Sequence, residues 1–253
     1  MTNDTDTMLL ADYLARGGKL TSPGNVPPRY RAELLRMMSS FVDSELAGSA
    51  GFANAINWAP GIQSRIAASR ITLEKADHAG RVLDLMVEFG TDRAKYEQAH
   101  DWAARGARDA QVDARRQGGD MRLSVFQYPL DGWTDAVVMN VLMGLATAHA
   151  VGEMARCSYQ PLSEVLHDIL PREKRHMELG RDGLERLIAQ DGSDQAAASV
   201  AYWMPRVADT FGPAKSASFE RLKALGLRHT DNETLRQAWR AEAGATLTPL
   251  GLV

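Results

Sequence analysis

Apolar residues recur at helical spacing along most of the chain, and the clearest case lies between residues 71 and 89. At about 100° per residue, the positions that share one face of this helix are Ile71, Val82, Leu85, Met86 and Phe89. Lys75 and His78 lie within about 40° of Ile71 on the same face. Because a buried ammonium group is costly unless it is paired, the pattern predicts that carboxylates from other helices face Lys75.

The same periodicity predicts four long helices, which cover residues 30–57, 62–89, 133–156 and 161–190. Glu45 continues the apolar stripe of the first helix, seven residues after Met38, and Glu173 lies in the apolar stripe of the fourth. Both carboxylates are therefore expected to point into the protein and to be the partners of Lys75. Pro171 is expected to kink or divide the fourth helix.

The remaining segments are shorter or irregular. We expect residues 1–26 to form an N-terminal arm and residues 27–253 to form a single helical domain. The segments predicted outside the four long helices are a short helix over 91–102, an irregular connection over 105–132, helices over 195–211 and 217–243, and an extended tail over 246–253. No segment reads as a convincing β-strand. The predicted fold is all-α, a four-helix bundle with additional C-terminal helices.

Composition and charge exclude several classes of protein. The net charge of −3 argues against a nucleic-acid binder. The chain has no run of about 18 consecutive apolar residues, as a membrane span requires, and no basic segment before an apolar run, as in a signal peptide. Cys157 is its only cysteine, which excludes an intrachain disulfide and fits a reducing compartment. We therefore expect a cytoplasmic protein that binds neither nucleic acid nor membranes, with Cys157 as a small packed side chain.

Two inward-facing histidines follow a spacing that is used by metal sites. In ferritin-like four-helix bundles with two metals, two helices give one carboxylate each and the other two give a Glu-x-x-His pair. Glu173 and His176 form such a pair, and at the matching spacing the second helix has Lys75 and His78. Glu45 lies 30 residues before Lys75, but the equivalent position in the other half of the bundle is a glycine. The layout predicts a ferritin-like bundle whose central site keeps part of this arrangement.

Several longer motifs strengthen this interpretation. They are DSELAGS (43–49), KADHA (75–79), FQYPLDGWTD (126–135), ARCSYQP (155–161), REKRH (172–176) and WMPRVADTFGP (203–213). With these motifs the chain resembles, over about residues 30–225, the phenylacetic acid catabolic proteins, which are the ferritin-like subunits of phenylacetyl-CoA epoxidase. Benzoyl-CoA epoxidase is a more distant relative of that family.

The resemblance implies a function. Catalytic members of the family activate O2 at a di-iron centre and epoxidise the aromatic ring of an acyl-CoA such as phenylacetyl-CoA, with electrons from a separate reductase. A sister subunit of the same fold, with a degraded metal site, pairs with the catalytic subunit. We therefore expect this chain to form a dimer, either with itself or with a ferritin-like sister subunit.

The resemblance also assigns metal-ligand positions. Four of the family's six iron ligands have a counterpart in this chain, namely Glu45, His78, Glu173 and His176. Lys75 replaces the glutamate of the second helix, and Gly144 replaces the aspartate of the third. Glu74, four residues before His78, is the one alternative carboxylate near the site.

The charge balance favours a site without metal. Four carboxylates balance two divalent irons, whereas this chain keeps two carboxylates and adds a lysine. Glu45, Lys75 and Glu173 are therefore predicted to form a nearly neutral network with His78 and His176. A single iron and a di-iron site, held by the four matching ligands, remain as alternatives.

Three functions are compatible with these observations. The first is an oxygenase of the phenylacetyl-CoA epoxidase kind with altered metal chemistry or with none, since some small subunits of ribonucleotide reductase also carry a lysine at such a position and work without metal. The second is a non-catalytic structural or acyl-CoA-binding sister subunit. The third, a helical scaffold without a small ligand, fits an inward Glu/Lys/His cluster poorly, because apolar replacements would make a pure scaffold more stable.

Overall fold

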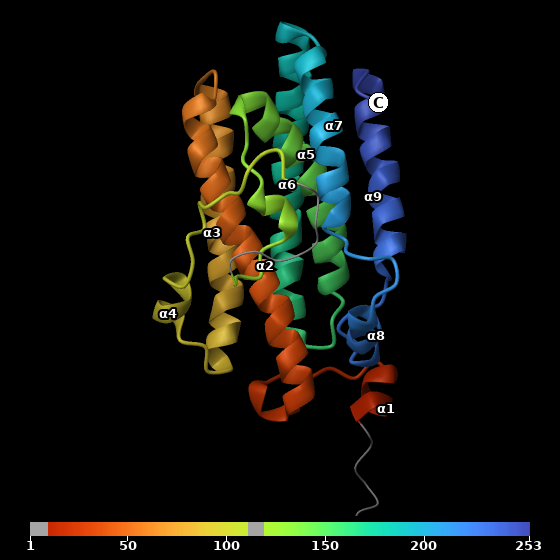
Figure 1. The fold of residues 1–253 in the computed structure, drawn as a ribbon. Helices are drawn as coiled ribbons and strands as arrows, with labels where there is room; N and C mark the ends of the chain where they lie inside the picture. The colour runs from red at the N-terminus through yellow and green to blue at the C-terminus, as the bar shows by residue number, and fades with distance from the viewer. Residues whose placement is uncertain (1–9, 111–118) are drawn as a thin grey trace, which may run out of the picture.

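Four long helices form the centre of the protein. The computed structural model describes residues 10–110 and 119–253, and within them the only β-type pairing is an isolated bridge between Leu20 and Tyr159. The long helices are α2 (Pro28–Ala55), α3 (Ile62–Glu88), α5 (Gly132–Met154) and α6 (Gln160–Asp191). They form a bundle in which α2 packs on α3 and α5 packs on α6 (Figure 1). The all-α, ferritin-like four-helix bundle expected from the sequence is confirmed.

The connection between the two helix pairs crosses the bundle. α3 ends at one end of the bundle and α5 begins at the other (Figure 1). The connection contains α4 (Arg93–Glu97) and the 3-10 helix η3 (Ser124–Gln127). α4 is shorter than the helix expected over 91–102, and beyond it the buried Arg122 donates to the carbonyl oxygens of Asp101, Trp102 and Ala104. These hydrogen bonds hold the segment after α4 in an irregular conformation. The part of the connection over 111–118 lies outside the described residues.

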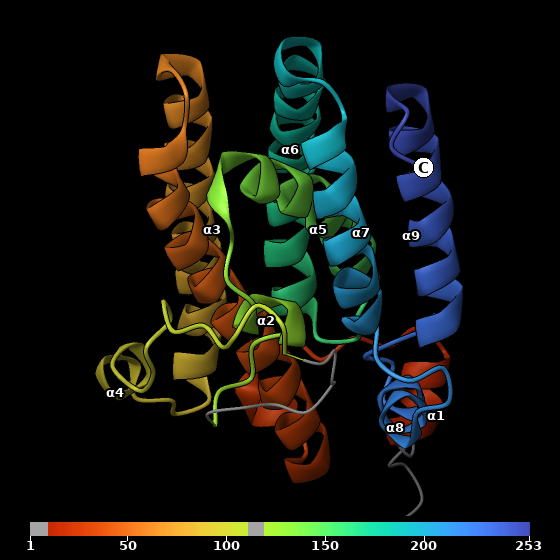
Figure 2. The ribbon, with the colours of Figure 1, turned by 45° about the horizontal axis from the view of Figure 1, so that its top comes forward.

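Shorter helices cover one side of the bundle. They are α1 (Leu10–Ala15), α7 (Asp194–Asp209), α8 (Ala217–Ala224) and α9 (Asn232–Leu247), with the 3-10 helix η4 (Thr248–Leu250) after α9. The other 3-10 helices are η1 (Pro23–Asn25), before α2, and η2 (Ile56–Trp58), between α2 and α3. α7 and α9 pack against α5, and α8 lies beside α1 below the end of α9 (Figure 2). In the N-terminal segment, residues 1–9 lie outside the described residues, while Leu14 and Leu20 are buried against the body.

Two expectations for the C-terminal region are wrong. The single helix predicted over 217–243 is divided between α8 and α9, because Glu153 of α5 accepts hydrogen bonds from the main-chain N–H groups of His229 and Thr230 in the intervening loop. The tail predicted to be extended is instead largely helical. Leu247 and Leu252 are buried in the core around α5 and α7, and this burial holds the last turn in place.

Of the two effects expected of Pro171, a kink or a division of the fourth helix, the division is wrong, since α6 runs without a break from Gln160 to Asp191. Pro171 and His167, four residues earlier, are both exposed. The carbonyl group that loses its helical partner therefore lies on the solvent side of the helix, where water can replace the missing hydrogen bond.

α5 is the core helix of the protein. Among the described helices it alone is long and apolar enough to cross a membrane, but 67% of its most apolar window is buried. α6, α7 and α9 cover it, as expected of a helix in the core of a bundle.

Candidate functional site

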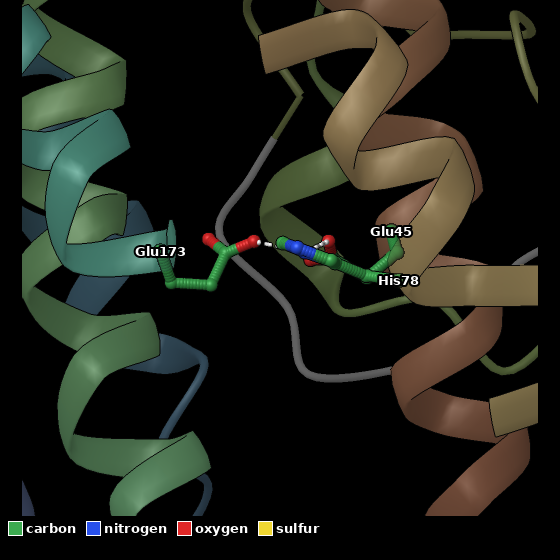
Figure 3. A group of neighbouring side chains, drawn as sticks. All are labelled: Glu45, His78 and Glu173. Carbon is green, nitrogen blue, oxygen red and sulfur yellow. Dashed lines mark hydrogen bonds and ion pairs between the residues drawn. The ribbon is translucent and has the colours of Figure 1, made fainter. Parts of the chain in front are cut away.

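The five candidate site residues meet in the middle of the bundle. Glu45 comes from the middle of α2, Lys75 and His78 come from α3, and Glu173 and His176 come from α6. All five are buried. Figure 3 shows the His78 ring reaching from α3 toward the Glu173 carboxylate on α6, with Glu45 close behind it. The helical spacing of the apolar stripes brings these polar groups together, since each replaces an apolar residue on an inward face.

Lys75 lies between the two carboxylates. Its Nζ atom is 3.0 Å from Glu45 Oε1 and 3.0 Å from Glu173 Oε2. Burial acts to lower the pKa of Lys75, but the charges of Glu173 and Glu45 and the hydrogen bonds to them outweigh it and raise the pKa above its ordinary value. Lys75 is therefore an ammonium group that ties α3 to both α2 and α6.

His78 shares the same two carboxylates. Its Nδ1 atom lies 2.8 Å from Glu173 Oε1 and 3.3 Å from Glu45 Oε2. Carboxylate oxygens only accept hydrogen bonds, so Nδ1 carries the proton. Burial opposes the charged ring, but the hydrogen bonds to Glu173 and Glu45 raise the pKa of His78 above its ordinary value. Lys75 and the Nδ1–H group of His78 thus give both carboxylates a donor inside the protein.

Glu173 is the most strongly held carboxylate of this cluster. Burial by itself would raise the pKa of Glu173, but the charge of Lys75 and the hydrogen bonds from His176 and His78 hold the pKa well below its ordinary value. Glu173 is therefore a buried anion whose stability depends on its cationic neighbours.

His176 forms the outer edge of the cluster together with Glu74. Its Nε2 atom lies 2.7 Å from Glu74 Oε2, and its Nδ1 atom lies 3.5 Å from Glu173 Oε1. The rings of His176 and His78 stack with their centres 5.8 Å apart. The Glu74 side chain is 27% exposed, so Glu74 closes the cluster from its solvent side. Its four-residue distance from His78 indicated proximity to the site, but the contact with His176 depends on how α3 packs on α6 and has no signal in the sequence.

The site does not fit a pair of irons. Glu45, His78 and Glu173 have potential ligand atoms within 4.8 Å of one another, so the group could hold one metal ion. However, Lys75 occupies hydrogen-bonding positions on both carboxylates. Gly144, where the resemblance implies an aspartate, has no room for a side chain without a shift, because a Cβ atom there would lie 2.8 Å from the Cβ atom of Met177. Within the described residues, the cluster thus offers one group of three potential ligands, and Lys75 already holds both of its carboxylates.

Cys157 lies away from this cluster. It is fully buried, burial raises the pKa of its thiol to about 11, and its Sγ atom lies 3.4 Å from the carbonyl oxygen of Tyr159. A protonated, inaccessible thiol is a packed side chain, as the sequence predicted.

Comparison with known proteins identifies the family of this chain. No curated protein matches the chain. The sequence profile of the phenylacetic acid catabolic proteins matches residues 20–253, which is nearly the whole chain and includes every residue of the central cluster. The chain therefore belongs to the phenylacetic acid catabolic protein family.

Proposed function

We propose that this chain is a metal-free, non-catalytic subunit of an aromatic acyl-CoA oxygenase of phenylacetate catabolism. The observation that carries the proposal is the position of the Lys75 ammonium group, 3.0 Å from a carboxylate oxygen of each of two helices. It places a fixed positive charge where a metal-binding member of the family has a ligand. Of the three functions compatible with the sequence, this corresponds to the sister subunit.

The chemistry of the cluster supports this function. Carboxylates supply both the charge balance and the hard oxygen ligands for iron, and here the two buried carboxylates already have cationic partners. Removing Lys75 from them would leave a desolvated ammonium group without a partner. Lys75 instead joins α2, α3 and α6 across the space that a metal would bridge, so the bundle keeps its shape without one.

A subunit of this kind acts through a partner. We infer that it binds a metal-bearing relative of the same fold, which would take phenylacetyl-CoA or a similar aromatic acyl-CoA as substrate and receive electrons from a reductase. A cytoplasmic location follows from that role. A homodimer of this chain would be the alternative assembly.

The experiment combines this chain with a relative of the same family that carries all six metal ligands. The pair is expected to co-purify and to oxygenate phenylacetyl-CoA, whereas this chain alone shows no turnover. A His176→Gln substitution in this chain should change the turnover of an intact complex by no more than about twofold, because the imidazole of His176 takes no part in the reaction. Turnover by this chain alone, or loss of turnover in the intact variant complex, would contradict the proposal.

A further inference from the structure

A cavity lies next to the charge cluster, between the bundle and the C-terminal helices. Its volume is about 200 Å³. Its walls come from α2 and α5 on one side and from η3, the segment after α7, α8 and α9 on the other. Most of the wall is apolar and rich in aromatic and methionine side chains, including Phe41, Phe126, Met143, Met154, Phe211 and Leu235. Residues on the α2 and α5 side are mostly buried and those from α8 and α9 are half-buried, so the cavity approaches the surface beneath the C-terminal helices.

The ionised groups in the wall are already paired. Glu45, at the boundary with the charge cluster, is held by Lys75 and His78. Glu153 accepts hydrogen bonds from the main-chain N–H of Thr230 at 2.8 Å and from its hydroxyl group at 2.9 Å. Neither carboxylate is free to neutralise a cationic ligand, and both would repel an anionic one.

Arg228 also lines this wall, and its Nη2 atom donates to the carbonyl oxygen of Thr230 at 3.0 Å and to Asn232 Oδ1 at 3.2 Å. Its Nε atom is buried and has no hydrogen-bond acceptor among the described residues, and the nearest carboxylate oxygen, Glu153 Oε1, lies 3.8 Å away. A buried N–H donor without a partner is costly. The cavity therefore offers a large apolar volume together with one donor that a ligand can use.

We propose that this cavity binds a small, uncharged, mainly apolar molecule that carries one carbonyl-type acceptor for Arg228. An apolar cavity of about 150 Å³ is large enough for benzene, so the volume here suits a ring with a short substituent, about 8 to 12 non-hydrogen atoms in all. The methionine side chains allow the wall to adapt to different rings. The site requires neither a metal nor a second subunit, so it is independent of the proposed function.

Acetophenone is a suitable probe, since it is an uncharged ring with one carbonyl group. Benzoate and protonated benzylamine have nearly the same size with a negative or a positive charge. By isothermal titration calorimetry, acetophenone is expected to bind saturably, at least tenfold more tightly than either ion. Ethylbenzene, which lacks the acceptor, should bind more weakly than acetophenone.

Variants locate the binding. Ala146→Leu and Ala150→Leu add bulk to the α5 wall of the cavity and should each weaken acetophenone binding at least tenfold. Ala150 is half-buried, so its variant keeps the test available if the more deeply buried Ala146→Leu protein does not fold. Ala148→Leu, on the same helix but outside the cavity wall, should bind like the unmodified protein. Absence of saturable acetophenone binding, unchanged binding by a folded cavity variant, or equally tight binding of benzoate would overturn the proposal.

Discussion

Lys75 has the role of an internal counter-ion. Its ammonium group lies 3.0 Å from an oxygen of Glu45 and 3.0 Å from an oxygen of Glu173, in a region that water scarcely reaches. Each partner needs the others, since two adjacent buried carboxylates without a cation would repel each other. The cluster therefore stabilises the bundle only as a complete set.

Replacing Lys75 by methionine tests this dependence. Loss of one partner from a buried ionic cluster costs about 3–5 kcal/mol of unfolding free energy, because Glu45 and Glu173 lose their shared cation. Urea denaturation of the two proteins measures the difference. Lys174→Met is the matched control, since Lys174 is exposed on α6 next to Glu173. Equal stability of both variants would show that Lys75 is not a required counter-ion.

Residues on apolar stripes were predictable, whereas partners from loops were not. The inward positions of Glu45, Glu173 and His78 follow from helical periodicity. In contrast, the four-residue spacing of His149 and Glu153 predicts a surface pair, but His149 contacts Glu242 at 2.8 Å and Glu153 is buried with Thr230. The contact between Glu153 and Thr230 depends on where the loop after α8 packs, and no local sequence pattern encodes it.

At the scale of elements, α5 and α6 pack tightly against each other at two glycines. A Cβ atom on Gly144 would lie 2.8 Å from the Met177 Cβ atom, and one on Gly180 would lie 2.5 Å from Asn140 Nδ2. The contact at Gly144 explains why a carboxylate cannot simply be restored there.

Gly144→Ala should therefore destabilise the protein by about 1–3 kcal/mol through overpacking. Gly152 lies on the same helix, and its added Cβ atom would meet only Leu170 Cδ2, at 3.9 Å. Gly152→Ala should be neutral or stabilising by up to about 1 kcal/mol, as alanine favours a helix. Thermal or urea unfolding compares the two, and a Gly144→Ala protein as stable as Gly152→Ala would show that the close helix contact is unimportant.

Asp135 joins α5 to α7 and gives the stability a pH dependence. It accepts hydrogen bonds from three side chains: Arg108, Ser199 and Trp203. Burial opposes ionisation, but these bonds and the main-chain N–H of Asp131 hold the pKa of Asp135 below its ordinary value of 3.8. The stabilisation is therefore fully present above that value and is lost as pH falls toward the native pKa.

Asp135→Asn should lower by one the number of protons that the protein takes up when it unfolds in acid. Between the native and the unfolded pKa, the slope of stability against pH should fall by about 1.4 kcal/mol per pH unit, although the variant is less stable at neutral pH. Urea unfolding at a series of acid pH values measures the slope. Asp131→Asn, at an 81% exposed side chain, should keep the slope of the unmodified protein. An unchanged slope in Asp135→Asn would contradict the assigned direction of the pKa shift.

The lengths of the main elements were largely predictable. The observed bounds of α2, α3, α5 and α6 differ by at most two residues from the predicted helices, because a long amphipathic pattern specifies both period and extent. The break between α8 and α9 was not predictable, since main-chain bonds to Glu153 of a distant helix compete with local helix formation.

At the scale of the whole molecule, α3 exposes an apolar stripe. Ile62, Ile66 and Leu73 are 77%, 50% and 71% exposed, and their spacing places them on one face. α3 and α9 lie on opposite sides of the protein in both views (Figures 1 and 2). An exposed apolar stripe of this kind is a candidate surface for the proposed partner subunit.

Leu73→Glu should therefore weaken pairing with the metal-bearing relative at least tenfold, since it places a charge in an apolar contact. Ala241→Glu, on an exposed position of α9, should leave pairing unchanged. Sedimentation velocity of the mixed subunits measures both. Equal pairing by the two variants would place the contact elsewhere on the surface.

The central claim is that Lys75 takes the place of metal in this bundle. The direct measurement is iron per chain, determined on protein purified after growth with added iron and again after anaerobic titration with Fe(II). The unmodified chain is expected to hold well below one iron, and Lys75→Glu, which removes the cation and supplies a carboxylate, should hold more. One or two irons per chain in the unmodified protein would contradict the account.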